Sequence, residues 1–211
     1  MKVIVPEPAL LRMPLYVYAL KQMRLAEPDR VTVSATRFEE ILQFNASQVR
    51  KDLAYTGLVG RPRIGYVVTE LIEALERLIG WDVVREAYLV GAGHLGAALL
   101  AHERIVSHGV KVVAAFDVDP VKVGRDFVGL PTYHVEELPR RAREASIEIG
   151  IVAVPHAHAQ YVADLMFDGG IRGIWNFAPI RLNVAAGVIV QNEDIFSSVV
   201  MLSRRIAAED H

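Results

Sequence analysis

The chain has 211 residues, of which 52% are hydrophobic and 23% are charged, and its formal net charge is −2. It contains no cysteine, which excludes a disulfide framework, a thiolate zinc site and a cysteine nucleophile. The start of the chain is broken by Pro6 and Pro8 and does not read as a signal peptide, and no apolar run approaches the about 18 residues of a membrane span. We therefore expect a cytoplasmic protein with no membrane partner and with one or two domains of roughly 100–150 residues.

The first predicted element is an amphipathic helix over residues 10–25, which "EPDR" ends. Apolar residues recur there at intervals of three and four, which is the spacing of one helix face. The residues that indicate this face include Leu11, Leu15, Tyr18 and Leu25.

Two shorter helices follow. Ser34 precedes the second, in whose first turn Thr36 and Glu39 have the spacing of a capping box. Asn45 is the expected N-cap of the third, with Gln48 as its reciprocal partner. Three short helices joined by tight turns are typical of a helix-turn-helix.

The segment 58–68, "LVGRPRIGYVV", has glycine and proline at a loop tip followed by β-prone residues, which predicts the hairpin wing of a winged helix. Residues 47–66 contain four basic side chains and one acid, a balance that suits phosphate contacts. The same pattern also fits the solvated face of an ordinary helical domain, and neither a strongly basic balance nor aromatic interleaving decides between them. The candidate DNA contacts are Ser47, Gln48, Arg50, Lys51, Arg61, Arg63 and Tyr66.

A further helix over residues 69–79 leads to a domain boundary at "GWD", residues 80–82. After it, β-rich apolar runs alternate with helical stretches, which predicts a parallel sheet with helices on both faces. The runs are "AYLVG", "VKVVAAFDVD", "IEIGIVAVP", "IRGIWNFAP" and "GVIVQ". The fold class is therefore α/β, with a winged helix-turn-helix domain over residues 1–80 followed by a Rossmann-like domain.

The stretch "EAYLVGAGHLGAALL" places a G-x-G-x-x-G motif between a predicted strand and a predicted helix. Gly91 permits the tight turn, Gly93 lets the backbone approach a pyrophosphate, and Gly96 allows close packing of helix on strand. The amide groups at the helix start face the phosphates. This context predicts a dinucleotide site.

Asp117 ends the next predicted strand, 21 residues after Gly96, where an acid can accept hydrogen bonds from the adenosine ribose. Because an acid there repels a 2′-phosphate, NAD(H) is favoured over NADP(H). The alternative is a turn residue at the strand end. Asp119 before Pro120 is expected to cap a helix.

No catalytic residue and no metal site is predicted. His156 and His158 follow a strand end, but two residues apart on a helix their rings point to nearly opposite sides, which makes them a poor metal pair. Pro155 ends that strand against the cofactor, while Asn176 offers an amide and Phe177 a ring near the nicotinamide. Nothing in this part of the chain resembles a proton relay.

The order of these parts resembles the Rex family of redox-sensing transcriptional repressors. The motifs that carry the resemblance are "ASQVRKDLAYTG" (family form close to S-x-I-R-K/R-D-x-S-Y-F-G), "FDVDPVKVG", "NFAP" and the acidic "NEDI" before the last helix. It covers nearly the full chain.

The resemblance implies a homodimer whose N-terminal domains bind an inverted-repeat operator, and whose Rossmann domains, residues 81–192 here, bind NADH or NAD⁺. NADH releases the DNA and NAD⁺ competes with it. The C-terminal helix, residues 193–211, swaps across the dimer. The cofactor site expected from the motifs comprises Gly91, Ala92, Gly93, His94, Leu95, Gly96, Asp117, Val118, Val154, Pro155, Asn176, Phe177, Ala178 and Pro179.

The chain departs from the family pattern at two of three residues that link nucleotide state to DNA binding. Tyr18 stands where members usually have arginine, and His102 where they have tyrosine, whereas the acid is kept as Asp194. In the wing, Arg63 replaces a family glycine. Two alternatives to an NADH-sensing repressor therefore remain, which are a DNA-binding paralogue with an altered redox response and an NAD-dependent oxidoreductase.

Overall fold

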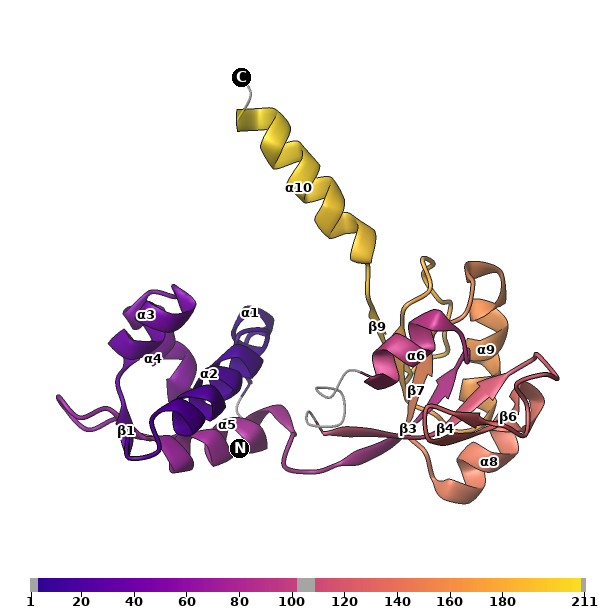
Figure 1. Ribbon diagram of the computed structural model, residues 1–211, viewed down its shortest axis with the longest axis horizontal. Helices are drawn as coiled ribbons and strands as arrows, with labels where there is room; N and C mark the ends of the chain where they lie inside the picture. Colours follow the sequence, from indigo (N-terminus) through magenta and orange to yellow (C-terminus); the bar gives the residue numbers. More distant parts are fainter. Residues whose placement is uncertain (1–3, 102–108, 210–211) are drawn as a thin grey trace. The chain divides into compact units, whose positions relative to one another are not determined.

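A computed structural model describes residues 4–101 and 109–209 (Figure 1). The chain forms two compact units, Met1–Val83 and Val84–His211. The expected α/β class is confirmed. The assignment of three functional domains stays a prediction. Among the described residues, no helix is long and apolar enough to cross a membrane.

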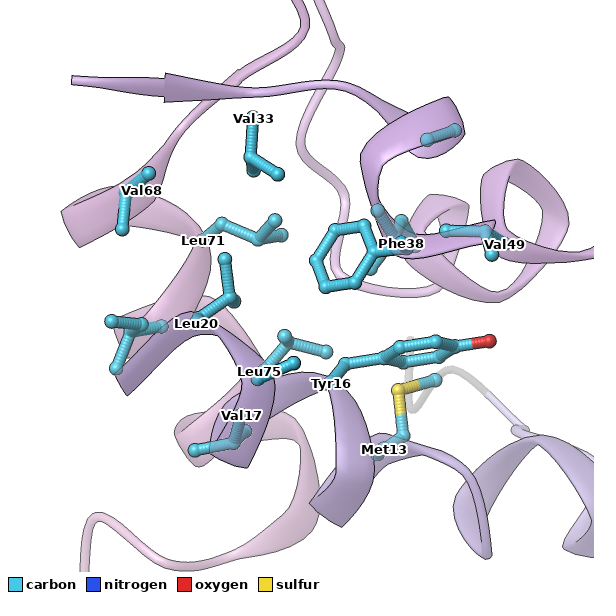
Figure 2. Packing of buried hydrophobic residues seen from close by; sticks show 14 of the residues in the cluster. Met13, Tyr16, Val17, Leu20, Val33, Phe38, Val49, Val68, Leu71 and Leu75 are labelled. Atoms are coloured by element: carbon cyan, nitrogen blue, oxygen red, sulfur yellow. The ribbon is translucent and has the colours of Figure 1, made fainter. Parts of the chain in front are cut away.

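The first unit is helical, with one small two-stranded sheet. Its core buries residues from every helix, including Tyr16 and Phe38, whose rings meet edge to face with centroids 5.3 Å apart (Figure 2). The elements are α1 (Glu7–Leu10), α2 (Met13–Ala26), β1 (Thr32–Val33), α3 (Ala35–Leu42), α4 (Ala46–Ala54), β2 (Tyr66–Val67) and α5 (Val68–Ile79).

The buried face of the first helical segment differs from the expected one. The segment breaks at Leu11–Arg12, and Pro14 lies in the first turn of α2. The expected face is exposed, with Leu11 at 69% and Leu25 at 75%. The residues of α2 that are buried instead are Met13, Tyr16, Val17, Ala19, Leu20 and Met23. The expectation was wrong because α2 carries apolar residues on more than one face, so spacing alone did not identify the buried one.

The caps of α3 and α4 are partly as expected. Asn45 caps α4 by accepting a hydrogen bond from the Ser47 amide at 2.8 Å, which confirms it as the N-cap. The reciprocal role expected for Gln48 is wrong, because its side chain bonds to Asp52. In α3 the cap is Ser34, which accepts from the Arg37 amide at 3.2 Å, so the capping box expected inside the first turn is wrong. The helix begins at Ala35, two residues before the start that a cap at Thr36 would give.

The second unit is a seven-stranded sheet in the order β5-β6-β4-β3-β7-β8-β9. Apart from the antiparallel edge strand β5, the pairs are parallel and follow the doubly wound order of a Rossmann fold. All five predicted strands are confirmed. The strands are β3 (Arg85–Val90), β4 (Val110–Asp117), β5 (Asp126–Phe127), β6 (Leu130–His134), β7 (Ile149–Val152), β8 (Gly173–Asn176) and β9 (Ile189–Asn192).

Helices cover both faces of this sheet (Figure 1). Leu99 and Leu100 of α6 pack on the side of Leu89 and Ile151, while Leu138 packs with Phe116 on the other side. The alternation of side chains along each strand therefore supplies two apolar layers. The helices are α6 (His94–Ala101), α8 (Leu138–Ala145), preceded by the short η1 (Val135–Glu137), α9 (His156–Asp168) and α10 (Ile195–Glu209).

The hairpin of β5 and β6 was not predicted. Its two turn residues, Val128 and Gly129, have φ angles of 54° and 80°, as in a type I′ turn. Asparagine and glycine are usual at these positions, and valine in the left-handed region is strained. Before this hairpin, residues 120–124 form turns and not the helix that Asp119 was expected to cap. Asp119 instead accepts from the Val121 amide at 2.9 Å within a turn.

We expect Val128→Asn to stabilise the second unit by about 1 kcal/mol, because asparagine tolerates positive φ at little cost. Little burial is lost, since Val128 is 52% exposed. The measurement is urea unfolding in a Trp81→Phe background, in which the fluorescence of Trp175 reports on this unit. The exposed Val121, where φ is not positive, provides the control Val121→Asn. An equal change in the free energy of unfolding in the two variants would contradict the presence of backbone strain at Val128.

Candidate functional site

The surface of α4 carries most of the candidate DNA contacts. Ser47, Arg50 and Lys51 are exposed, and Gln48 is half-buried. The Gln48 amide nitrogen donates one N–H to Asp52 Oδ1 at 2.8 Å, which leaves its second N–H and its carbonyl oxygen for other partners. This helix therefore presents two cations and a hydroxyl, groups that suit phosphates and base edges.

Asp52, which the sequence analysis did not single out, is the buried anchor of α4. It is 1% exposed and accepts four hydrogen bonds of 2.7–2.8 Å, from Arg12 Nε and Nη2, the Tyr16 hydroxyl and the Gln48 amide. The Tyr16 ring lies in the core with its oxygen pointing out of it (Figure 2). These bonds tie the start of α2 to α4.

Burial opposes ionisation of Asp52, but the hydrogen bonds from Arg12, Tyr16 and Gln48 outweigh it, so the pKa of Asp52 lies below its usual value. Burial and the bond to Asp52 together raise the pKa of the Tyr16 hydroxyl. The cluster therefore holds a charged carboxylate with both oxygens fully used. The sequence feature that could have identified Asp52 is an acidic residue on the buried face of a helix whose exposed face is basic.

The wing forms as a tight loop. Arg61 and Gly65 exchange backbone hydrogen bonds of 2.8 Å in both directions, and Arg63 stands exposed between them with a φ of 64°. Tyr66 does not point freely outward, because it is half-buried against the core of the unit and pairs with Val33 of β1. The return strand of the wing thus pairs with the segment before α3.

The glycine loop follows β3 as predicted, and its glycines differ in what surrounds them. A Cβ on Gly91, where φ is 108°, would lie 2.4 Å from the carbonyl oxygen of Ala153. A Cβ on Gly96 would lie 2.3 Å from the carbonyl oxygen of Gly91. At Gly93 a Cβ would meet no described atom within 4 Å. Two glycines are therefore needed by the fold, whereas the space beside Gly93 suits a pyrophosphate.

Asp117 lies at the end of β4 beside this loop. Its Oδ2 accepts from the Ala92 amide and from Lys122 Nζ, both at 2.9 Å, and its Oδ1 accepts from the Asp119 amide at 2.9 Å. Burial opposes ionisation, but these bonds outweigh it and keep the pKa of Asp117 below its usual value. A carboxylate at this edge suits a ribose.

The other predicted cofactor residues gather at the same edge of the sheet. His94, Leu95 and Val118 are exposed beside Gly96 and Asp117, Ala92 is buried within the loop, and Val154 and Pro155 follow β7. His156 and His158 are exposed on α9. Within residues 4–101 and 109–209, no three histidine, aspartate or glutamate side chains gather as a metal site.

Asn176 is held within the protein at the end of β8. Its side chain is fully buried, its nitrogen donates to Ala178 O, Ile180 O and Asn192 Oδ1, and its oxygen accepts from the Ala178 amide. The amide therefore orders the turn after β8, and its expected place near the nicotinamide stays a prediction. Every polar atom of the side chain already has a partner inside the protein.

The turn that Asn176 orders forms one wall of a pocket of about 470 Å³. Asp194 also lines this pocket and accepts from the Ser197 amide at 3.1 Å, where α10 begins. Trp175 donates to Glu193, another wall residue, at 2.9 Å. The walls are Phe177, Ala178, Pro179, Ile180, Arg181, Leu182, Asn192, Glu193 and Asp194.

The three expected switch residues are not all described. Tyr18 lies on α2 in the first unit and is 43% exposed. Asp194 lies in the second unit. His102 lies outside the described residues.

Two family models match the chain. The one described as "CoA binding domain" matches residues 85–180, and the one described as "Putative DNA-binding protein N-terminus" matches residues 4–54.

Curated relatives match over nearly the whole chain. A protein of Bacteroides thetaiotaomicron named redox-sensing transcriptional repressor Rex is 39% identical over 202 residues, 96% of this chain and 91% of the relative. A protein of Treponema denticola with the same name is 40% identical over 196 residues, 92% of each chain.

Solved structures match as well. The crystal structure of RSP in complex with β-NAD⁺ and operator DNA has a TM-score of 0.89 and 32% identity, and the match covers 99% of this chain and 95% of that chain. RSP in complex with β-NADH has a TM-score of 0.84 and 31% identity, over 99% and 97%. RSP is described as a Rex-family repressor.

Proposed function

The chain belongs to the Rex family of redox-sensing transcriptional repressors, and we propose that its glycine loop holds NAD(H) while α4 and the wing hold operator DNA. The observation that carries the nucleotide site is the open space at Gly93 beside the ionised Asp117. When bound, NADH or NAD⁺ supplies the redox signal. The residues of this chain bind and orient it.

For DNA, we propose that Arg50 and Lys51 neutralise phosphates while Ser47 and the Gln48 oxygen reach base edges. The Asp52 cluster holds α4 at a fixed angle to α2. Arg61 and Arg63 reach the adjacent groove from the wing. Tyr66 supports the base of the wing from within.

We propose that two copies pair through α10. Five apolar side chains of this helix are each more than half exposed, which is unusual for a helix that stays alone. A second copy offers the same face, as a two-fold interface requires. Two paired chains present two α4 helices to the two halves of an inverted repeat. The five residues are Val199, Val200, Met201, Leu202 and Ile206.

For the switch, we propose that NADH favours an arrangement of the dimer that does not fit the operator. A ligand shifts such an equilibrium only through its different affinity for the two arrangements. Tyr18 and Asp194, with His102, are the proposed link between nucleotide and DNA units. We propose no catalytic residues, and the relatives bear the name of a transcriptional repressor.

Selection of inverted-repeat duplexes from random DNA tests the DNA-binding part. Sedimentation of the purified chain with a selected duplex should give two chains per duplex, and the affinity should fall steeply with salt. Failure to select any duplex, together with turnover of a hydroxyl substrate by NAD⁺, would favour the oxidoreductase instead.

Arg63→Gly tests the wing separately from the fold. Glycine adopts the φ of 64° without strain, so stability should not fall. Operator affinity should drop about tenfold and the salt slope by about 1, because one phosphate or groove contact is lost. The exposed Arg24 on α2 gives the charge control Arg24→Gln. An unchanged operator affinity in Arg63→Gly would mean that the tip of the wing does not contact the DNA.

A further inference from the structure

The carboxylate of Asp117 is largely occupied before any nucleotide arrives. It accepts three hydrogen bonds, from the amides of Ala92 and Asp119 and from Lys122 Nζ, each at 2.9 Å. A carboxylate has about four acceptor positions. Only one of the two ribose hydroxyls can therefore donate to Asp117 while these bonds persist.

The remaining position is on Oδ1, whereas Lys122 is bound to Oδ2 of the same carboxylate. Its ammonium lies 2.9 Å from Asp117 Oδ2 and 4.0 Å from Asp119 Oδ2, and its side chain is 39% exposed. An ammonium has three N–H donors, of which Asp117 takes one. A donor is thus held by an ion pair at the edge of the sheet where the ribose is expected.

We propose that Lys122 is a nucleotide-recognition residue, and that the adenosine ribose is bound by the Asp117–Lys122 pair and not by the acid alone. One ribose hydroxyl donates to the free acceptor position of Asp117. The ammonium of Lys122 donates to the oxygen of the other hydroxyl. This inference rests on the proposed binding of NAD(H) at the glycine loop.

The pair also sets the preference between NADH and NADPH. Two carboxylates at this edge, Asp117 and Asp119, repel a 2′-phosphate, whereas the single ammonium attracts it. Lys122 therefore weakens the discrimination that Asp117 by itself would impose. Removing the ammonium should harm binding of both nucleotides, and binding of NADPH more.

The test is the dissociation constant of each nucleotide for the full chain, read from the fluorescence of Trp175 at one salt concentration. In Lys122→Met we expect the constant for NADH to rise about tenfold and that for NADPH to rise about tenfold more, since a charge-assisted bond is lost in both and an attraction to phosphate in one. Lys122→Arg should keep most of both affinities. Lys111→Met removes an exposed lysine at the other end of β4 and should change neither.

Two results would overturn the proposal. Unchanged or tighter NADH binding in Lys122→Met would mean that the lysine does not bind the ribose and only occupies an acceptor position of Asp117. An equal loss of affinity for NADH and NADPH would mean that Lys122 does not affect the preference between them. If Lys122→Met unfolds, Lys122→Gln replaces it, and an unchanged NADH-to-NADPH ratio there has the same meaning. A wild-type chain that binds neither nucleotide would instead overturn the proposed function.

Discussion

Replacing Asp52 with alanine should destabilise the first unit by about 3–5 kcal/mol and abolish operator binding. The substitution leaves the Arg12 guanidinium, the Tyr16 hydroxyl and the Gln48 amide without their common acceptor. A cost of this size is typical of removing one partner of a buried ion pair, and here it combines the unsatisfied hydroxyl of the buried Tyr16 with the guanidinium of Arg12, whose side chain is 23% exposed. The bonds that hold α4 against α2 are lost together.

The chain has two tryptophans, and one lies in each unit, Trp81 in the first and Trp175 in the second. Urea unfolding of Asp52→Ala in a Trp175→Phe background therefore reports on the first unit alone. The exposed Asp29 provides the control Asp29→Ala, which should change stability by less than about 0.5 kcal/mol. A loss below about 1 kcal/mol in Asp52→Ala would mean that the cluster contributes little.

The pH dependence of the stability of the first unit tests the role of Asp52 independently. The pKa of Asp52 is lowered by folding, so the stability it contributes is fully present above its unfolded pKa of about 3.9. That contribution is lost as the pH falls through the folded pKa. The wild-type unit should therefore weaken in acid below about pH 4 more steeply than Asp52→Ala.

Gly93→Val should lower the affinity for NADH by at least about 100-fold, which is about 2.7 kcal/mol, while the fold stays intact. A Cβ at Gly93 meets no described atom within 4 Å, so we expect the fold to accept a side chain there. It occupies the space through which the pyrophosphate reaches the amides at the start of α6. The loss therefore falls on the ligand alone.

The matched variant is Gly96→Ala, whose Cβ would lie 2.3 Å from the Gly91 carbonyl oxygen. It should lower the melting temperature of the second unit, which Gly93→Val should not. Titration of NADH against Trp175 fluorescence, with thermal unfolding of the same samples, separates the two effects. Wild-type affinity in Gly93→Val would show that the loop is only structural.

Most of the second unit could be predicted from the sequence, because buried parallel strands read as continuous apolar runs. The five runs from "AYLVG" to "GVIVQ" became neighbouring strands, and the glycine motif fell between β3 and α6. Asn45 could be predicted as a cap because that role depends on one side chain and its own helix.

The features that escaped prediction depend on contacts between distant residues or on strained turns. Nothing local in the sequence joins Arg12 to Asp52, which lie 40 residues apart. The hairpin after β4 turns on Val128, a residue that turn chemistry does not favour. The buried position of Asn176 follows from a turn that closes on Ile180 and Asn192, which no spacing rule indicates.

The central claim is that nucleotide redox state controls DNA binding by this chain, although Tyr18 and His102 stand where the family pattern differs. The most direct test is fluorescence anisotropy of a selected inverted-repeat duplex with the purified chain at one fixed salt concentration, titrated with NADH in the presence and absence of excess NAD⁺. We expect NADH to release the duplex and NAD⁺ to restore binding. Tight binding that ignores both nucleotides would contradict the claim and indicate a DNA-binding paralogue with an altered effector.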